Sequence, residues 1–277
     1  MNDSRLTDPV LLAESIKEKS CRLKTANGEV VYYSNRSPIK ETPNEDALGI
    51  IPVGDHSLVL VVADGMGGMP AGEHASKTII EVLTDKLINK SDSQTVRDCI
   101  LTGIDHADHL IKESKNGSGS TASIVEIANN QIRTYYAGDS LILLSSSHGT
   151  IKYLSTSHSP IGFALECGAI NQFTAMNHHE RNLISNYVGS QDMYIHIGPA
   201  INIDPEDTLV ISSDALSDNL YEQEICEFIR GGVLQKSVEE MIDACEQNML
   251  QEKQDRLCHP DDFSLICFRR VNEDTDT

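Results

Sequence analysis

Short apolar runs alternate with a few long amphipathic stretches along most of this chain. The short runs are rich in β-branched residues and are bounded by turn-forming residues, a pattern that predicts strands. We expect strands at 30–33, 47–51, 57–63, 121–128, 131–137, 141–144, 151–154, 208–212 and 263–268. The longer stretches place apolar residues at helical spacing and predict helices at 73–87, 95–115 and 237–251.

The strands follow one another closely, and this spacing indicates the fold class. Asn129-Asn130 is a plausible hairpin turn between two of them, and short turns imply antiparallel pairing. We therefore expect an α+β domain with antiparallel sheets and helices outside them, not a doubly wound parallel sheet. No internal repeat or linker divides the chain, so residues 26–270 are predicted to form one domain. Residues 1–25 are expected to be an arm or an extra helix, and 271–277 an acidic, disordered tail.

Composition narrows the possible partners. Among 277 residues, 42 acidic against 22 basic side chains give a formal net charge of −20. This excess argues against a nucleic-acid partner, because nucleic acid is bound through Lys and Arg. Solubility is the main explanation for the excess, and carboxylates gathered in a metal cluster are the other. The seven cysteines form no C-x-x-C pair, and no apolar run could span a bilayer. We expect a cytoplasmic protein with reduced thiols and no membrane contact.

The acidic residues are informative because of where they lie. Five aspartates each stand beside a predicted strand: Asp46, Asp64, Asp139, Asp214 and Asp261. Asp is also a common turn former, which accounts for any single one of them. If the strands end on one rim, however, the carboxylates converge and must bind protons or cations. Magnesium and manganese are the ions that prefer such oxygen ligands.

The glycines after Asp64 add a possible ligand, since Gly65 could offer its carbonyl oxygen to an ion held by Asp64. The sequence has no P-loop, dinucleotide fingerprint, G-x-S-x-G elbow or H-E-x-x-H motif. These absences favour metal-activated water over a covalent route.

Six motifs in a fixed order resemble the metal-dependent protein phosphatases of the PPM, or type 2C, family. They span roughly 30–270, and the form with Met66 after Gly65 is similar to the bacterial branch. The resemblance implies a four-layer α-β-β-α sandwich of two antiparallel sheets flanked by helices. The motifs are Asn44-Glu45-Asp46, Val62-Ala63-Asp64-Gly65-Met66-Gly67-Gly68, Gly119-Ser120-Thr121-Ala122, Tyr136-Ala137-Gly138-Asp139-Ser140, Ser212-Ser213-Asp214-Ala215-Leu216-Ser217-Asp218 and Asp261-Asp262-Phe263-Ser264.

The resemblance also implies a ligand set for two or three divalent ions, Mn or Mg. Asp64 would bridge two metals, and Gly65 would bind one of them through its carbonyl. Asp214 would serve both the second metal and, with Asp139, a third and weaker site. A metal-bridging hydroxide would attack the phosphorus of phosphoserine or phosphothreonine. The remaining ligands of the second metal would be Asp46 and Asp261, with Glu45 as a contributor through water; Asp46, Asp64, Asp214 and Asp261 are the expected catalytic residues.

Departures from the family pattern leave two roles open. Glu41 occupies the position of the arginine that usually binds the substrate phosphate, so Lys40 or Arg36 is expected to replace it. Met66 stands where eukaryotic members have a proposed acid, and a metal-bound water or His158 is a candidate for that role. Residues 155–200 correspond to the variable flap beside the active site.

We therefore predict a monomeric serine/threonine phosphatase that acts on the phosphoprotein substrates of a kinase. One alternative is a non-catalytic pseudophosphatase that binds a phosphoprotein partner. Another is a phosphatase dedicated to a single regulatory protein, such as an anti-sigma-factor antagonist. The presence of every expected metal carboxylate favours the enzyme over the first alternative, whereas the sequence does not separate the enzyme from the second.

Overall fold

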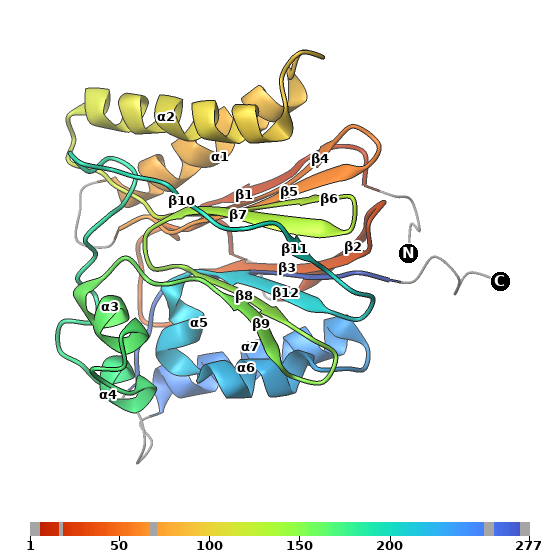
Figure 1. The fold of residues 1–277 in the computed structure, drawn as a ribbon. Coiled ribbons are helices and arrows are strands. Elements are labelled where there is room, and N and C mark those ends of the chain that lie inside the picture. The colour runs from red at the N-terminus through yellow and green to blue at the C-terminus, as the bar shows by residue number, and fades with distance from the viewer. Residues whose placement is uncertain (1–5, 17–18, 67–70, 252–257, 272–277) are drawn as a thin grey trace.

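The computed structural model of the chain describes residues 6–16, 19–66, 71–251 and 258–271. Over these residues the strands form two antiparallel sheets that face each other, with helices on both outer sides (Figure 1). The expected α-β-β-α sandwich is confirmed.

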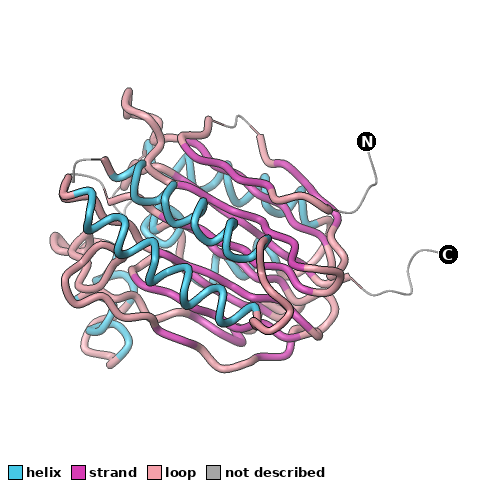
Figure 2. The backbone as a smooth tube through the Cα atoms, turned by 90° about the horizontal axis from the view of Figure 1, so that it is seen from above, coloured by secondary structure: helices cyan, strands magenta, loops and turns pink. Residues whose placement is uncertain are grey.

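The first sheet contains seven strands within the described residues, in the order β1-β4-β5-β6-β7-β10, with β11 also paired to β7. Helices α1 (Gly72–Ile88) and α2 (Val96–Ser114) cover its outer face (Figures 1 and 2). The strands are β1 (Val10–Ala13), β4 (Ala47–Val53), β5 (Ser57–Ala63), β6 (Ala122–Ala128), β7 (Gln131–Ala137), β10 (His196–Ile197) and β11 (Ile201–Asn202).

The second sheet contains six strands within the same described residues, in the order β2-β3-β13-β12-β8-β9. Helices α5 (Asp214–Asn219), α6 (Glu222–Ile229) and α7 (Leu234–Leu250) cover its outer face. Two short helices, α3 (Pro160–Glu166) and α4 (Gln172–Met176), lie beside one end of the sandwich (Figure 1). The strands are β2 (Cys21–Lys24), β3 (Glu29–Asn35), β8 (Leu141–Ser145), β9 (Ile151–Leu154), β12 (Thr208–Ser212) and β13 (Phe263–Arg269).

Strand β5 shows why the central strands read as continuous apolar runs. Its alternate side chains Val59, Val61 and Ala63 face the α1/α2 layer. Those between them, such as Leu60 and Val62, face the second sheet. Because successive side chains on a strand point to opposite faces, a strand that is covered on both sides must be apolar at every position.

The elements expected from the sequence are present, and each strand end differs from its expected position by no more than two residues. The hairpin turn is also confirmed, since Asn129 and Asn130 have φ angles of 51° and 59°. Helix α7 begins at Leu234, three residues earlier than expected. The short helices α3, α4, α5 and α6 were not expected, because segments of five to eight residues are too short for a reliable helical period.

The expectation for residues 1–25 was wrong. They form neither an arm nor a helix in their described part: β1 pairs with β4 and β2 pairs with β3, so each extends one sheet at its edge. β1 and β2 are four-residue edge strands in a largely polar segment, and it is the neighbouring strand that defines each of them. Residues 272–277 of the expected acidic tail lie outside the described residues. No described helix has the length and apolar character needed to cross a membrane.

Candidate active site

Strand register brings the acidic residues of the first sheet to one rim. Ala47, the first residue of β4, pairs with Ala63, the last residue of β5. Asp46 therefore precedes β4 at the same end of the sheet where Asp64 follows β5.

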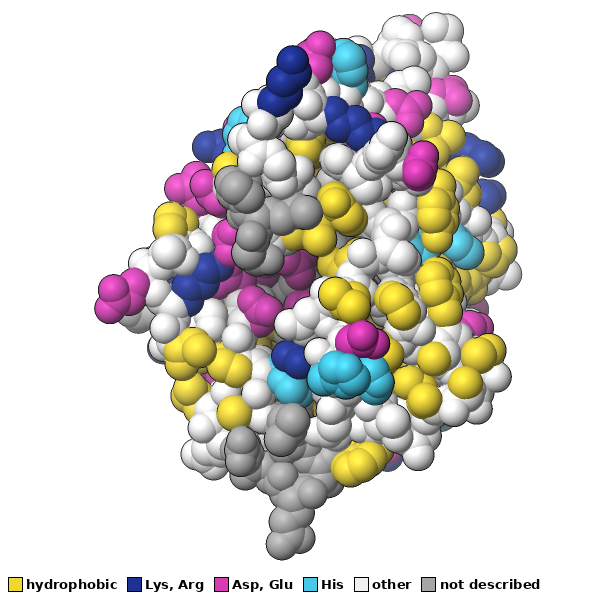
Figure 3. Space-filling view, turned by 90° about the vertical axis from the view of Figure 1, so that its left-hand side faces the viewer, with side chains coloured by type: hydrophobic (Ala, Val, Ile, Leu, Met, Phe, Trp, Pro, Cys, Tyr) yellow, Lys and Arg dark blue, Asp and Glu magenta, His cyan; other side chains and the backbone are white. Residues whose placement is uncertain are grey.

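The second sheet contributes the other carboxylates to the same rim. Ser212, at the end of β12, pairs with Leu265 on β13 and with Leu141, the first residue of β8. The ends of β12, β13 and β8 that face the rim are therefore continued by Asp214, Asp261 and Asp139. Acidic side chains gather in a hollow on this face of the molecule (Figure 3).

Mutual repulsion shows how close these groups are. Burial raises the pKa of Asp64 well above its ordinary value, and the negative charges of Asp46, Asp214, Asp261 and Asp139 raise it further. The pKa of Asp214 is raised in the same way, first by burial and then mainly by Asp261. Asp261 itself remains exposed to solvent, although its pKa is also raised. The five aspartates chosen from the sequence thus form one electrostatic unit.

Asp46 is the most enclosed of the five, with 1% of its surface exposed. Both of its carboxylate oxygens lack a hydrogen-bond partner among the described residues. Burial, together with Asp262 and Asp261, raises its pKa to about 8. The nearby hydroxyls of Ser213 and Ser264 oppose this rise, but neither makes a hydrogen bond of normal geometry with Asp46. A buried carboxylate without partners is costly unless it binds a proton or a cation.

Asp139 extends the acidic rim toward helix α5. Burial and the charge of Asp218 raise the pKa of Asp139 to about 7, and its Oδ1 has no described hydrogen-bond partner. Asp218, on α5, has a pKa raised to about 6 by burial, against the opposing effect of Arg181. Asp218 belongs to the same group of carboxylates but was not identified as a site residue from the sequence.

The residues of the rim fit divalent cations. Within the described residues, no three acidic, histidine or cysteine side chains already surround one point closely enough to ligate an ion together. The donors are nevertheless all oxygens, several are buried, and those of Asp46 and Asp139 have no described partner. Hard cations such as Mg²⁺ and Mn²⁺ match this donor set better than zinc or copper.

The residues around Asp64 hold it in place. The amide N–H of Asp64 donates to Thr121 Oγ1 at 3.0 Å, and the N–H of Thr121 donates back to the Asp64 carbonyl at 2.8 Å. Thr121 Oγ1 also lies 2.7 Å from Ser140 Oγ, beside Asp139. Gly65 has no room for a side chain, since a Cβ would lie 2.4 Å from the carbonyl oxygen of Glu45. The glycine after Asp64 is thus required by close backbone approach. Gly67 and Gly68 of the same motif lie outside the described residues.

The two cations expected to bind substrate phosphate are already engaged. Lys40 Nζ forms ion pairs with Glu45 and with Asp262, the latter at 2.7 Å. Asp262 also accepts hydrogen bonds from the backbone N–H groups of Ser37 and Glu45, each at 2.7 Å, so it fastens this loop beside Asp46. Arg36 Nη1 donates to the carbonyl of Glu41 at 3.2 Å. The role of Lys40 and Arg36 in phosphate binding stays a prediction.

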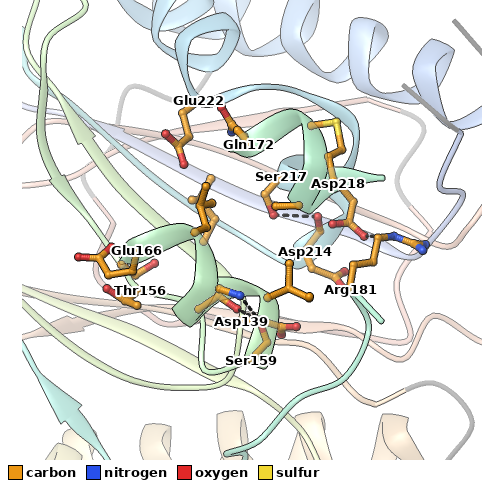
Figure 4. Close-up of a pocket in the computed structure, with 18 of the residues that line it drawn as sticks. Asp139, Thr156, Ser159, Glu166, Gln172, Arg181, Asp214, Ser217, Asp218 and Glu222 are labelled. Carbon is orange, nitrogen blue, oxygen red and sulfur yellow. Dashed lines mark hydrogen bonds and ion pairs between the residues drawn. The ribbon is translucent and has the colours of Figure 1, made fainter. Parts of the chain in front are cut away.

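A cavity of about 300 Å³ opens beside Asp139 and Asp214, between the rim and the flap (Figure 4). Arg181 lines it, and its Nε donates to Asp218 Oδ2 at 3.1 Å. Within the described chain, the Nη groups of Arg181 form no other hydrogen bond or ion pair. The sequence held a signal for this residue, because it is the single Lys or Arg between 155 and 200.

His158 is buried and hydrogen-bonded to the loop before Asp139 and to the flap. Its Nδ1 accepts hydrogen bonds from the Gly138 N–H at 3.2 Å and from Asn186 Nδ2 at 2.9 Å. Its ring stacks on Tyr136 with 4.9 Å between centroids, and 2% of its surface is exposed. Burial, and to a smaller extent His196, lowers its pKa to about 4. A neutral ring whose Nδ1 accepts two hydrogen bonds holds the loop before Asp139 against the flap.

Comparison with known proteins agrees with this geometry. The family model for Protein phosphatase 2C matches residues 43–161. The serine/threonine phosphatase stp of Listeria monocytogenes is 28% identical over 196 residues, covering 68% of this chain and 77% of the relative. The solved structure of Stp1 from Staphylococcus aureus covers 93% of this chain and 100% of its own, with 20% identity and a TM-score of 0.76. The catalytic domain of the phosphatase PstP, solved with two manganese ions, covers 88% of this chain and 98% of its own, with 20% identity and a TM-score of 0.67.

The fold and the acidic rim define a metal-dependent protein phosphatase. Residues 43–161 of this chain match the protein phosphatase 2C family model, and its sequence relatives include bacterial serine/threonine phosphatases.

Proposed function

We propose that this chain removes phosphate from phosphoserine and phosphothreonine in proteins, with the acidic rim as its catalytic centre. The observation that carries the proposal is the convergence of Asp46, Asp64, Asp214 and Asp261 from two sheets, with every pKa raised. The cavity beside this rim offers room for a phosphorylated side chain. The Listeria relative, which aligns over most of its own length, bears the name of a serine/threonine phosphatase.

The rim would hold two or three divalent ions, manganese or magnesium. Asp64, which is repelled by each of the other rim aspartates, is the natural ligand to share between two ions. Asp139 and Asp214 would serve a third ion next to the cavity. When bound, such ions lower the pKa of water and stabilise negative charge on a phosphoryl group. The set of ligands would be Asp46, Asp64, the carbonyl oxygen of Gly65, Asp139, Asp214 and Asp261.

Arg181 is the residue that we propose to bind the substrate phosphate. A guanidinium presents paired N–H donors that match two phosphate oxygens, which a lysine ammonium does not. Asp218 accepts a hydrogen bond from the Nε of Arg181, and within the described residues the Nη donors have no partner. Lys40 would then act mainly on the loop that carries Asp46, through Glu45 and Asp262.

The cellular setting follows from charge and cysteine usage. We expect phosphoproteins made by a serine/threonine kinase as substrates and no nucleic-acid partner, given the net charge of −20. All seven cysteines are free, a state that suits the reducing cytoplasm. One chain supplies every proposed site residue, and we expect it to act as a monomer. Nothing in the site favours a binding-only role over catalysis.

Hydrolysis by the purified protein tests the proposal. A phosphothreonine peptide and p-nitrophenyl phosphate would be incubated with manganese, with magnesium or with EDTA. We expect turnover with at least one metal and none with EDTA. Protein that binds manganese, shown by calorimetry, but hydrolyses neither substrate would contradict the proposal.

A further inference from the structure

The cavity beside the active site has two ends of different character. Arg181, Asp214 and Asp139 lie at one side, whereas Glu166 and Glu222 lie at the side away from Arg181 (Figure 4). Glu166 ends helix α3 of the flap, and Glu222 begins helix α6 over the second sheet. We call the side with Arg181 the phosphate end and the side with Glu166 and Glu222 the glutamate end. Both are parts of one cavity.

The two glutamates have no counter-charge; Glu166 is exposed and Glu222 is half-buried. In the part of the chain that the structure describes, neither the Glu166 nor the Glu222 side chain forms an ion pair or a hydrogen bond. Burial raises the pKa of Glu222, and the charge of Glu166 raises it further. By contrast, Asp218 at the other end of the cavity is paired with Arg181. The glutamate end is therefore unbalanced in charge.

The wall between the two ends combines serine and threonine side chains with a larger apolar part. The apolar part is formed by residues of β8, β9, α3 and α4, among them Leu141, Leu154, Leu165 and Met176. At about 300 Å³, the cavity stands at the lower limit of ordinary ligand pockets and suits one or two side chains, not a folded segment. A lysine or arginine side chain meets both requirements, because its stem packs on apolar surface while its head remains charged.

We propose that the glutamate end is a specificity subsite for a basic residue that flanks the phosphorylated residue of the substrate. The substrate phosphate would lie at Arg181 and the rim, the aliphatic stem of the neighbouring Lys or Arg would lie on the apolar part of the wall, and its cationic head would lie between Glu166 and Glu222. The occupant is the substrate chain itself, so this inference rests on the proposed function. It is argued from charge complementarity in a cavity that is shared with the reacting group.

Phosphothreonine peptides that differ at one flanking position test the subsite. At each of the nearest positions on both sides of phosphothreonine, peptides carrying Lys, Ala or Glu would be compared by kcat and KM. We expect the wild type to prefer Lys over Glu by about tenfold at one position, through a lower KM. Glu222→Gln should reduce this preference to about threefold or less, and Glu222→Lys should invert it. Glu81→Gln, an equal change of charge on the exposed face of α1, is the matched control and should leave the preference unchanged.

Equal kcat/KM for the Lys and Glu peptides at every position would overturn the subsite, as would a preference that Glu222→Gln leaves intact. Hydrolysis of p-nitrophenyl phosphate, which has no flanking residue, should be equal in wild type and Glu222→Gln. If the wild type does not hydrolyse this substrate at all, the proposed function, and not the subsite alone, is contradicted. Peptide affinity measured by fluorescence anisotropy with Asp64→Asn gives a readout without turnover. The Lys peptide should again bind about tenfold more tightly than the Glu peptide, and equal affinities would also overturn the subsite.

Discussion

The acidic rim and the flap lie side by side but are built in opposite ways. The rim aspartates continue strands that are covered on both faces, and Asp46 has 1% of its surface exposed. The flap contains two short helices and exposes large apolar side chains, including Phe163 at 44%, Phe173 at 52% and Leu183 at 52%. A rigid sheet end suits carboxylates that must keep a fixed geometry, whereas a surface segment suits recognition.

A few specific contacts fasten the flap to the rest of the molecule. His158 contacts Gly138, Arg181 pairs with Asp218, and the Gly189 N–H donates to Asp108 on α2 at 2.8 Å. The rim therefore depends on the whole core for its position, and the flap depends on individual hydrogen bonds and ion pairs. Substitutions in the two regions should differ in size and in the kinetic constant that they change.

The largest effect is expected at the rim, from Asp64→Asn. The amide keeps the size of the side chain but removes the charge that would hold cations, so kcat should fall by about a thousandfold or more. Asp55→Asn is the matched control, because Asp55 is an exposed turn residue at the opposite end of the same two strands. Steady-state kinetics on p-nitrophenyl phosphate and thermal melting check the pair of variants. Activity of Asp64→Asn within a few-fold of wild type, with the fold retained, would refute the site assignment.

The same contrast explains what the sequence could predict. Strands covered on both faces leave a long apolar signal, and their ends mark the positions of the rim aspartates. The family motifs stand at those ends too, so the five aspartates could be chosen before the structure was known. Their convergence depends on strand register, which brings Ala47 opposite Ala63 and Ser212 opposite Leu265.

The flap and the pairing of surface charges could not be predicted in this way. Arg181 stands in a segment without a clear period, and its partner Asp218 is 37 residues away along the chain. Lys40 was chosen as a phosphate ligand because of its place in the chain, but Asp262 and Glu45 engage it from elsewhere. Such contacts depend on tertiary packing and leave no local pattern.

The second largest effect should come from Arg181→Ala in the flap. Loss of a bidentate phosphate contact should raise KM for a phosphothreonine peptide by about tenfold to a hundredfold, with a smaller change in kcat. Arg181→Lys should recover part of that loss, since it restores charge but not the fork. Lys40→Ala is the informative comparison, because it tests the residue favoured by the sequence. A larger increase in KM for Lys40→Ala than for Arg181→Ala would mean that Lys40, and not Arg181, binds the substrate phosphate.

Cation-free protein should lose stability as pH rises. The pKa values of Asp46, Asp139 and Asp218 are raised to about 8, 7 and 6, so the folded chain keeps protons that the unfolded chain releases near pH 4. A raised carboxylate pKa makes the unfolding free energy fall with pH between those two values. With EDTA, Tm should therefore be lower at about pH 8 than at about pH 5.5. Added manganese should raise Tm more at the higher pH, and Asp46→Asn should flatten the dependence. A Tm in EDTA that stays level or rises over this range would contradict the electrostatic account of the rim.

The smallest effect is expected where rim and flap meet, at His158. Replacing it with Leu removes the acceptor shared by the Gly138 N–H and Asn186 Nδ2, and so loosens the flap against the loop before Asp139. We expect kcat/KM for a phosphothreonine peptide to fall by about threefold to tenfold, mostly through KM, since one or two buried donors lose their partner. His158→Asn places an oxygen acceptor close to the position of Nδ1 and should restore most of the activity, which a purely space-filling role would not predict. His196→Leu is the matched control, because His196 also stacks on Tyr136 but is exposed and makes neither hydrogen bond. Equal losses in the Leu and Asn variants of His158 would mean that its ring, and not its hydrogen bonds, joins the flap to the catalytic rim.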